Sequence, residues 1–304
     1  MKWNWNVVCV SLFLVCSCPL SGYAQDPAKA GPGGGQGQQR RIGMDPVDDR
    51  VQLREYHFAD TDETLPYAVF VSSKVVKEKK APLVLALHGF SGNHGTFMRT
   101  QCVEEAEKNG FILVGTMGYS PSGSFGMPMG NMGRKLPTGP GMPGMNNPGG
   151  KKETDPAKVV ELSEKDAMNV LEIARKEFNV DDRRIYLMGH SLGGGGALHL
   201  GQKYSSIWAG VAALAPGAFG IQWTADSKFK EVPLYIVVGE GDTMIASVRN
   251  LDTQLKSLNI PHEYKELSGM DHGSIIGGSM PEVFKFFNQH TKSKQEKLPD
   301  AIRN

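Results

Sequence analysis

The feature that most restricts the fold is an alternation of short apolar runs with longer amphipathic stretches, which extends from about residue 83 to residue 290. Strands buried on both faces read as continuous apolar runs, and helices cover the parallel sheets that they form. The pattern predicts an α/β fold in which a mostly parallel sheet of about eight strands has helices on both faces. Six strands are expected at 83–87, 111–116, 184–188, 210–214, 234–238 and 262–266, and helices at 98–109, 160–178, 192–204, 244–258 and 281–290.

Ahead of these runs, residues 51–58 and 65–71 alternate between polar and apolar side chains around a polar turn, which predicts an antiparallel hairpin. We expect one large domain over 49–292, followed by a polar tail at 293–304. The formal net charge of the 304 residues is +1. Because no basic stripe or acidic tail is present, nucleic acid is not an expected partner.

The first residues have the pattern of an export signal. Lys2 precedes an apolar run at 7–15, and small residues, among them Ala24, follow it. We therefore expect a signal peptide at 1–24, a flexible Gly/Gln-rich linker at 25–48, and a periplasmic or secreted protein without a transmembrane segment. An alternative is a lipobox, in which Cys18 carries a lipid anchor.

Three of the four cysteines lie inside the predicted signal peptide, at positions 9, 16 and 18. The mature chain would then keep only Cys102, which we interpret as a small buried hydrophobic residue on a helix. An internal disulfide is not possible with a single cysteine, so stability must come from packing.

Residues 117–157 form an insertion rich in Gly, Pro and Met between a predicted strand and a predicted helix. A connection of this length is usually either mobile or functional. Two interpretations stay open, a mobile excursion and a border of the substrate cleft. The methionines by themselves are weak evidence for copper, since the insertion contains no cysteine or histidine, and no metal or organic cofactor is expected.

The segment 184–198 contains Gly189-His190-Ser191-Leu192-Gly193, a G-x-S-x-G motif between a predicted strand and a predicted helix. On such a turn the serine side chain is pushed out of the sheet, and the glycines relieve clashes with neighbouring backbone. The motif alone occurs often by chance in a glycine-rich chain, but the strand before it and the helix after it are what the chemistry requires. Ser191 is therefore the candidate nucleophile.

A serine hydroxyl needs a histidine to take its proton and a carboxylate to orient that histidine. When a serine on such a turn is the nucleophile, the acid and then the histidine follow it in the chain, each after a later strand. Asp242 follows the apolar run at 234–238, and His272 follows the strand at 262–266. The order and positions make Asp242 the candidate acid and His272 the candidate base.

Asp271 and Glu240 are alternatives for the acid, although Asp271 is adjacent to His272 and neighbouring side chains seldom face each other. The other histidines are interpreted as structural or surface residues. This interpretation covers six of the seven: His57, His88, His190, His199, His262 and His290, of which His88 is expected to brace its own loop.

Two backbone N–H groups are needed to stabilise the negative charge that develops on the substrate carbonyl. Leu192, directly after the candidate nucleophile, supplies the first. The second is expected from the loop 88–92 after the strand at 83–87, and Phe90 is our candidate within it.

With these residues in place, the chain resembles secreted α/β-hydrolases of the polyhydroxybutyrate depolymerase and feruloyl esterase group, and more distantly the catalytic domain of prolyl oligopeptidases. The resemblance covers about residues 50 to 290 and rests on short motifs. They are Leu87-His88-Gly89, the segment 180–187 leading into 189–194, Gly241-Asp242 and His272-Gly273. It implies an α/β-hydrolase fold, the Ser191, Asp242 and His272 triad, and hydrolysis of carboxylic esters without a cofactor.

Three functions are consistent with this sequence. The leading hypothesis is a serine esterase that cleaves an ester on a small molecule or a polymer, such as an aromatic ester of plant polysaccharide or a hydroxyalkanoate oligomer. A serine peptidase of the prolyl oligopeptidase type would use the same residues. The third is a binding protein on an inactive hydrolase scaffold.

Overall fold

The computed structural model describes residues 47–129, 152, 153, 155–218 and 220–293. All of them belong to one unit, Arg41–Asn304. The expected signal peptide, most of the linker, the greater part of the insertion and residues 294–304 lie outside the described residues. Among the described helices, none combines the length and the apolar character that crossing a bilayer requires.

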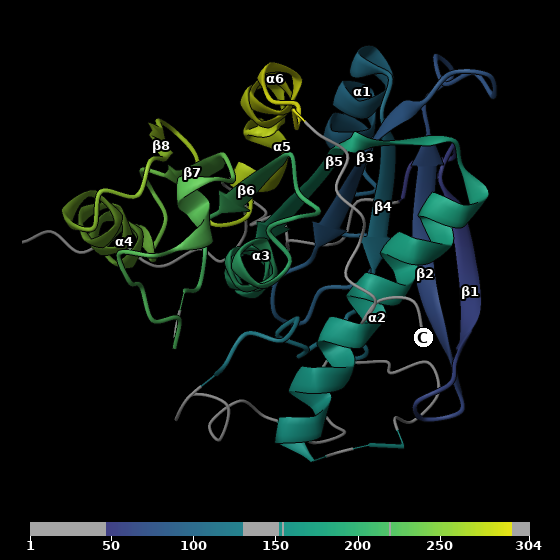
Figure 1. Ribbon diagram of the computed structural model, residues 1–304, viewed down its shortest axis with the longest axis horizontal. Coiled ribbons are helices and arrows are strands. Elements are labelled where there is room, and N and C mark those ends of the chain that lie inside the picture. The colour runs from purple at the N-terminus through teal and green to yellow at the C-terminus, as the bar shows by residue number, and fades with distance from the viewer. Residues whose placement is uncertain (1–46, 130–151, 154, 219, 294–304) are drawn as a thin grey trace, which may run out of the picture. The chain divides into compact units, whose positions relative to one another are not determined.

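The described elements form one sheet with helices packed against it (Figure 1). The strands are β1 (Gln52–Phe58), β2 (Glu63–Val71), β3 (Ala81–Leu87), β4 (Ile112–Thr116), β5 (Val180–His190), β6 (Gly210–Leu214), β7 (Leu234–Gly239) and β8 (Glu263–Leu267). The helices are α1 (Thr100–Asn109), α2 (Pro156–Glu177), α3 (Leu192–Lys203), α4 (Ile245–Ser257), α5 (Ile275–Gly278) and α6 (Met280–Gln289), with a short 3₁₀ helix, η2 (Lys228–Lys230).

The sheet has eight strands in the order β1-β2-β4-β3-β5-β6-β7-β8. β2 runs antiparallel to both β1 and β4, and the other neighbours are parallel. The predicted α/β class and mostly parallel sheet are confirmed. Because the parallel strands share one direction, the carboxyl ends of β3, β5, β6 and β7 meet at one edge of the sheet, where the loops that carry chemistry in such folds are found.

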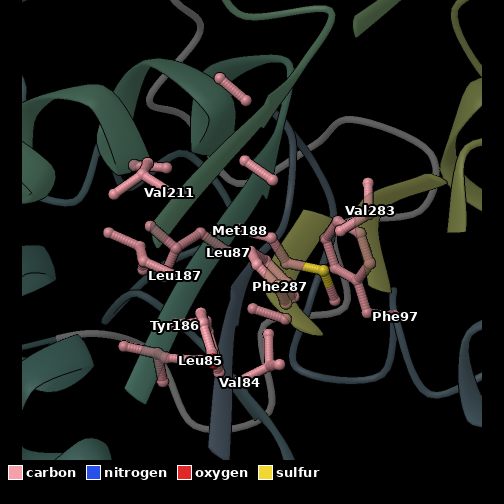
Figure 2. Packing of buried hydrophobic residues seen from close by; sticks show 14 of the residues in the cluster. Val84, Leu85, Leu87, Phe97, Tyr186, Leu187, Met188, Val211, Val283 and Phe287 are labelled. Carbon is pink, nitrogen blue, oxygen red and sulfur yellow. The ribbon is translucent and has the colours of Figure 1, made fainter. Parts of the chain in front are cut away.

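The central strands are apolar on both faces because helices cover both. Every residue of β3, β4, β6 and β7 is buried. Figure 2 shows side chains of successive residues of β5 on opposite sides of the sheet, with Tyr186 and Met188 facing Phe287 of α6, and Leu187 on the other side with Val211. Figure 1 shows α2 and α3 together on the face away from α1 and α6.

Helix α2 begins at Pro156, four residues earlier than the pattern predicted. The side chain of Asp155 accepts hydrogen bonds from the backbone N–H groups of Ala157 and Lys158, and proline follows at the first helical position. Both features stabilise a helix start, because they satisfy or remove N–H groups that lack partners within the helix. The spacing of apolar residues reports only the buried face of a helix. The predicted helix therefore began too late, because the first turn of α2 is polar.

The part of the insertion that the structure describes before residue 130 is packed against the domain. Phe125 and Met127 are fully buried, and a Cβ atom added to Gly196 or Gly195 of α3 would meet them. The Phe125 N–H donates a hydrogen bond to the hydroxyl of Ser163 on α2. Residues 117–127 therefore form a fixed layer over α2 and α3, and we call this layer the bracket.

Candidate active site

Ser191 is the single residue between β5 and α3, with φ 55° and ψ −116°. The turn is tight on both sides. A Cβ atom at Gly189 would lie 2.0 Å from the carbonyl oxygen of Gly193, and one at Gly193 would lie 2.2 Å from that of Leu87. Only glycine fits at these two positions of the motif, so the two glycines allow β3, β5 and α3 to approach closely enough to expose Ser191 at the sheet edge.

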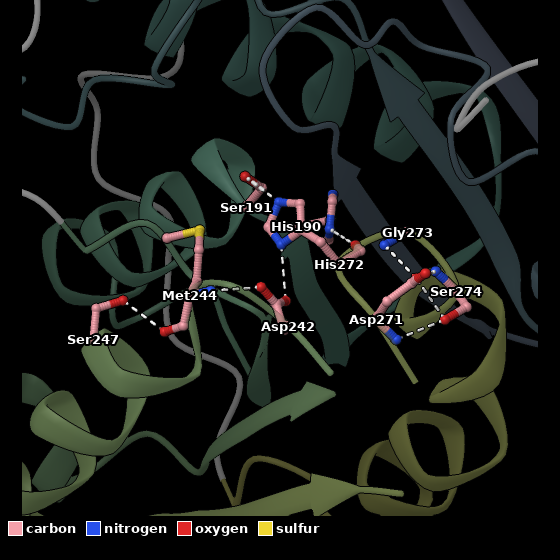
Figure 3. A network of polar contacts seen from close by, with 9 residues as sticks. All are labelled: His190, Ser191, Asp242, Met244, Ser247, Asp271, His272, Gly273 and Ser274. Atoms are coloured by element: carbon pink, nitrogen blue, oxygen red, sulfur yellow. Dashed lines mark hydrogen bonds and ion pairs between the residues drawn. The ribbon is translucent and has the colours of Figure 1, made fainter. Parts of the chain in front are cut away.

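His272 lies on the turn after β8 and contacts Ser191 (Figure 3). Its Nε2 is 3.0 Å from Ser191 Oγ, and its Nδ1 is 2.8 Å from Asp242 Oδ2. An ionised carboxylate only accepts hydrogen bonds, so Nδ1 carries the proton and Nε2 of the neutral ring is free to accept from the serine hydroxyl. This tautomer is the one that a general base acting on Ser191 requires.

Asp242 follows β7, and its side chain is fully shielded from solvent. Its second oxygen, Oδ1, accepts a hydrogen bond of 2.7 Å from the backbone N–H of Met244. These two hydrogen bonds fix the orientation of the Asp242 carboxylate relative to the ring of His272. A buried carboxylate with both oxygens bonded is well suited to hold an imidazole in one orientation and to stabilise its charged form.

In the described part of the chain, neither alternative acid is hydrogen-bonded to His272. Asp271 Oδ1 accepts hydrogen bonds from the N–H groups of Gly273 and Ser274, and from the Ser274 hydroxyl, so its carboxylate is bound within its own turn. The bonds from Ser274 lower the pKa of Asp271. Glu240 is exposed. In the described part of the chain, the carboxylate hydrogen-bonded to His272 is that of Asp242.

The two candidate oxyanion donors belong to two segments next to Ser191. Leu192 is the first residue of α3, and Phe90 lies in the loop after β3. That loop lies against the serine, since a Cβ atom at Gly89 would be 3.1 Å from Ser191 Cβ. Within the described residues, neither the Leu192 nor the Phe90 N–H donates a hydrogen bond to the protein, so both are available to a ligand.

The bracket supports this loop through His88 and Ser91. The buried His88 ring has Nε2 2.8 Å from the carbonyl oxygen of Met117 and lies edge-on to Phe125, with ring centroids 5.3 Å apart. Ser91 donates its N–H to the carbonyl oxygen of Pro121 over 2.8 Å. Burial lowers the pKa of His88. The expected bracing role of His88 agrees with these contacts, but sequence reasoning missed its partners because nothing in a Gly/Pro/Met-rich pattern predicts packing.

Four other histidines have partners away from Ser191. His199 Nε2 lies 3.1 Å from Glu164, His262 Nε2 lies 2.9 Å from Asp252, His290 Nδ1 lies 2.8 Å from the carbonyl oxygen of Phe286, and His57 Nε2 lies 3.8 Å from Asp62. Across the described ranges, no three His, Cys, Asp or Glu side chains are arranged to hold a metal ion. Cys102 is buried, as expected.

The esterase family model, described as "Putative esterase", matches residues 64–274, which is more than half of the chain. The chain belongs to this esterase family. The predicted enzyme class, a carboxylic-ester hydrolase, is confirmed. Of the expected resemblance, the comparisons support the esterase group and not the polyhydroxybutyrate depolymerases specifically. No curated protein matches the sequence.

Solved structures with a similar fold include several esterases. S-formylglutathione hydrolase from Agrobacterium tumefaciens is 17% identical, with a TM-score of 0.58 over 80% of this chain and 95% of that one. A ferulic acid esterase from Anaeromyces mucronatus, solved with ferulic acid, is 15% identical, with a TM-score of 0.57 over 78% and 90%. Fluorophosphonate-binding serine hydrolase F from Staphylococcus aureus is 14% identical, with a TM-score of 0.53 over 79% and 97%. At these identities the similarity shows the α/β-hydrolase fold.

Proposed function

We propose that this esterase acts through an acyl-enzyme on Ser191, with His272 as the general base and Asp242 as the residue that orients it. The observation that carries the proposal is the unbroken run of hydrogen bonds from Asp242 through His272 to Ser191, at the edge where the parallel strands end. Each side chain comes from a loop after a different strand, so the fold itself brings them together.

The reaction follows from the protonation states of these groups. As Ser191 Oγ attacks the ester carbonyl carbon, its proton passes to Nε2 of His272, and the carbonyl oxygen becomes an oxyanion. The N–H groups of Leu192 and Phe90 stabilise that charge, together with the positive N-terminal end of α3. His272 then protonates the leaving alcohol as the C–O bond breaks. Water repeats the sequence on the acyl-enzyme and releases the acid.

The experiment is hydrolysis of chromogenic esters, from acetyl to feruloyl, beside matching anilides, by the wild-type protein and by Ser191→Ala. Feruloyl is included because one neighbour of similar fold is a ferulic acid esterase. The expected result is ester turnover that the substitution abolishes, with the far-ultraviolet circular dichroism spectrum and thermal unfolding unchanged. Residual turnover near the wild-type rate in Ser191→Ala would refute the proposal.

The anilides test the peptidase hypothesis. The same three residues can cleave an amide if His272 protonates the leaving amine. Turnover of anilides alone would assign a peptidase. Covalent labelling by a fluorophosphonate probe requires an activated serine and not merely a pocket. Wild-type protein that neither turns over any substrate nor reacts with the probe would favour the binding-protein hypothesis.

We also propose that the chain is exported and that its signal peptide is removed after Ala24. The support is the pattern of Lys2, the apolar run and the small residues before position 25. Intact-mass spectrometry of the protein produced in a bacterial host with its leader distinguishes the two processing routes. An intact mass that corresponds to a chain beginning at Gln25 supports soluble export. A mass that corresponds to a lipid-modified chain beginning at Cys18 supports the alternative.

A further inference from the structure

His190, the variable residue of the G-x-S-x-G motif, contacts His272 in two ways (Figure 3). Its Nε2 lies 2.7 Å from the backbone carbonyl oxygen of His272, and the two rings lie against each other with centroids 4.6 Å apart. His190 is almost completely buried, with 4% of its surface exposed. The residue before the serine therefore touches the histidine that the serine also touches.

The first of these contacts has a defined direction. A carbonyl oxygen only accepts hydrogen bonds, so Nε2 of His190 is the nitrogen that carries the proton. Burial, followed by the positive charge that His272 can carry, lowers the pKa of His190 to about 4. The ring is therefore neutral near pH 7 and does not repel the imidazolium that forms on His272 during the reaction.

The contact matters because His272 lies on an irregular turn, 268–274, and not within a strand or a long helix. Its side chain is 30% exposed and bonds to Asp242 and Ser191. In the described part of the chain, the hydrogen bond that the backbone carbonyl of His272 accepts comes from His190. Two consecutive residues of the G-x-S-x-G motif thus hold His272 at two points, His190 at the backbone and Ser191 at the ring.

We propose that His190 is a positioning residue, whose Nε2–H holds the backbone of His272 at the distance from Ser191 that proton transfer requires. This inference rests on the proposed function of Ser191 and His272. A displacement of about 1 Å in such a group can cost on the order of 10²-fold in rate. Because His190 does not touch the substrate in this role, its loss should lower kcat and leave KM nearly unchanged.

The test compares three variants that differ in the group offered to the His272 carbonyl. In His190→Gln the side-chain amide nitrogen is separated from Cβ by the same number of bonds as Nε2 of histidine, so it can donate the same hydrogen bond. His190→Met has a similar length and no donor. His190→Asn has a donor that is one bond too short to reach, and it serves as the second variant without the contact if methionine prevents folding.

The expected result is a loss in kcat of about 10- to 100-fold in the Met and Asn variants, with KM within about twofold, and a His190→Gln variant within about fivefold of wild type. A second measurement needs no turnover. The downfield proton NMR resonance of the proton shared by His272 and Asp242 should be retained in His190→Gln, and broadened or lost in the other two. Folding is checked by thermal unfolding of each variant.

Two outcomes would overturn the inference. One is wild-type kcat in a folded His190→Met or His190→Asn variant, and the other is a His190→Gln variant as slow as His190→Met, which would mean that the donor is not what matters. The parallel Ser191→Ala control separates this failure from that of the proposed function. If Ser191→Ala abolishes turnover and His190→Met does not change it, only the positioning role fails.

Discussion

The backbone of Ser191 lies in a region of φ and ψ that side-chain-bearing residues rarely adopt, which costs on the order of 1–3 kcal/mol. The surrounding structure holds it there. Ser191 donates its N–H to the carbonyl oxygen of Leu214 over 2.9 Å, and its own carbonyl oxygen accepts from the N–H groups of Gly195 and Gly217. A strained backbone that three hydrogen bonds hold at the end of a strand is typical of functional positions.

Asp242→Asn should lower kcat by about 10⁴-fold, since the neutral amide can donate to Nδ1 of His272 and stabilise the wrong tautomer. Steady-state kinetics on the best ester of the panel measures the loss. The matched control is Glu240→Gln, which makes the same chemical change two residues earlier, on an exposed side chain. We expect the control within about twofold of wild type. Comparable losses in both variants would contradict the assignment of the acid.

Among the elements, the bracket of residues 117–127 connects the loop after β3 to two helices. Glu164 of α2 accepts hydrogen bonds from Lys203 and Tyr204, at the end of α3, and lies directly under Gly126. Gly126 has φ +84°, and a Cβ atom there would be 2.1 Å from Glu164 Oε2. The bracket can therefore lie this close to the Glu164 carboxylate only because residue 126 is glycine.

Gly126→Ala should destabilise the fold and slow the reaction, because the bracket must shift and it supports His88 and Ser91. The control is Gly110→Ala, which has a similar φ of +75° and only Lys74 Cβ nearby, at 3.6 Å. The control should lose about 1–2 kcal/mol of unfolding free energy from its backbone alone. Urea unfolding and kcat are measured for both. A Gly126→Ala variant no less stable than Gly110→Ala, with wild-type kcat, would contradict the role of the bracket.

Glu164 also makes stability depend on pH. Burial raises its pKa, but hydrogen bonds from His199, Lys203 and Tyr204 lower it by more, to about 2. A carboxylate with a pKa below that of the unfolded chain stabilises the fold above about pH 4.5, and this contribution is lost as the pH falls toward 2. Glu164→Gln should therefore be less stable than wild type at pH 6, with a smaller difference at pH 3. Urea unfolding at both pH values tests this, and an equal difference at both would contradict it.

For the described body of the protein as a whole, stability depends on aromatic packing between the sheet and α6. Tyr186 of β5 stacks on Phe287 with centroids 4.7 Å apart, and its hydroxyl donates a 2.6 Å hydrogen bond to the carbonyl oxygen of His290. Phe111 and Phe284 extend the cluster. It lies on the α6 face of the sheet, near the amino ends of β4 and β6 rather than at the carboxyl ends where Ser191 lies.

Phe287→Ala should cost about 3–5 kcal/mol of unfolding free energy, because Phe287 is fully buried and its loss leaves a cavity. Leu53→Ala is the control, since 61% of Leu53 is exposed, and it should change stability by less than about 0.5 kcal/mol. Urea unfolding gives both values. In conditions where Phe287→Ala stays folded, kcat should be close to wild type, and a large loss of kcat would show that this cluster also shapes the site.

From the amino-acid sequence alone one can predict the layer structure, the tight strand-to-helix turn at Ser191, and the order of Ser191, Asp242 and His272 along the chain. These depend on local patterns: the apolar runs that become β3, β5 and β7, and the glycines that only a tight strand-to-helix turn requires. Each of these patterns can be recognised within a window of about fifteen residues. A strand that is buried on both faces requires apolar residues, and a close approach of two backbone segments requires glycine.

Three features became visible only in the folded protein. They are the carboxylate that contacts His272, the packing of residues 117–127, and the hydrogen bond from His190 to the backbone of His272. In the sequence, Asp271 is nearer to His272 than Asp242 is. The carboxylate of Asp271, however, accepts a hydrogen bond from the backbone N–H of Ser274 in its own turn. The direction of a side chain on a loop depends on hydrogen bonds and packing with residues far away in the chain. Such contacts form only once the strands are in register, so they cannot be predicted from a short segment of the sequence.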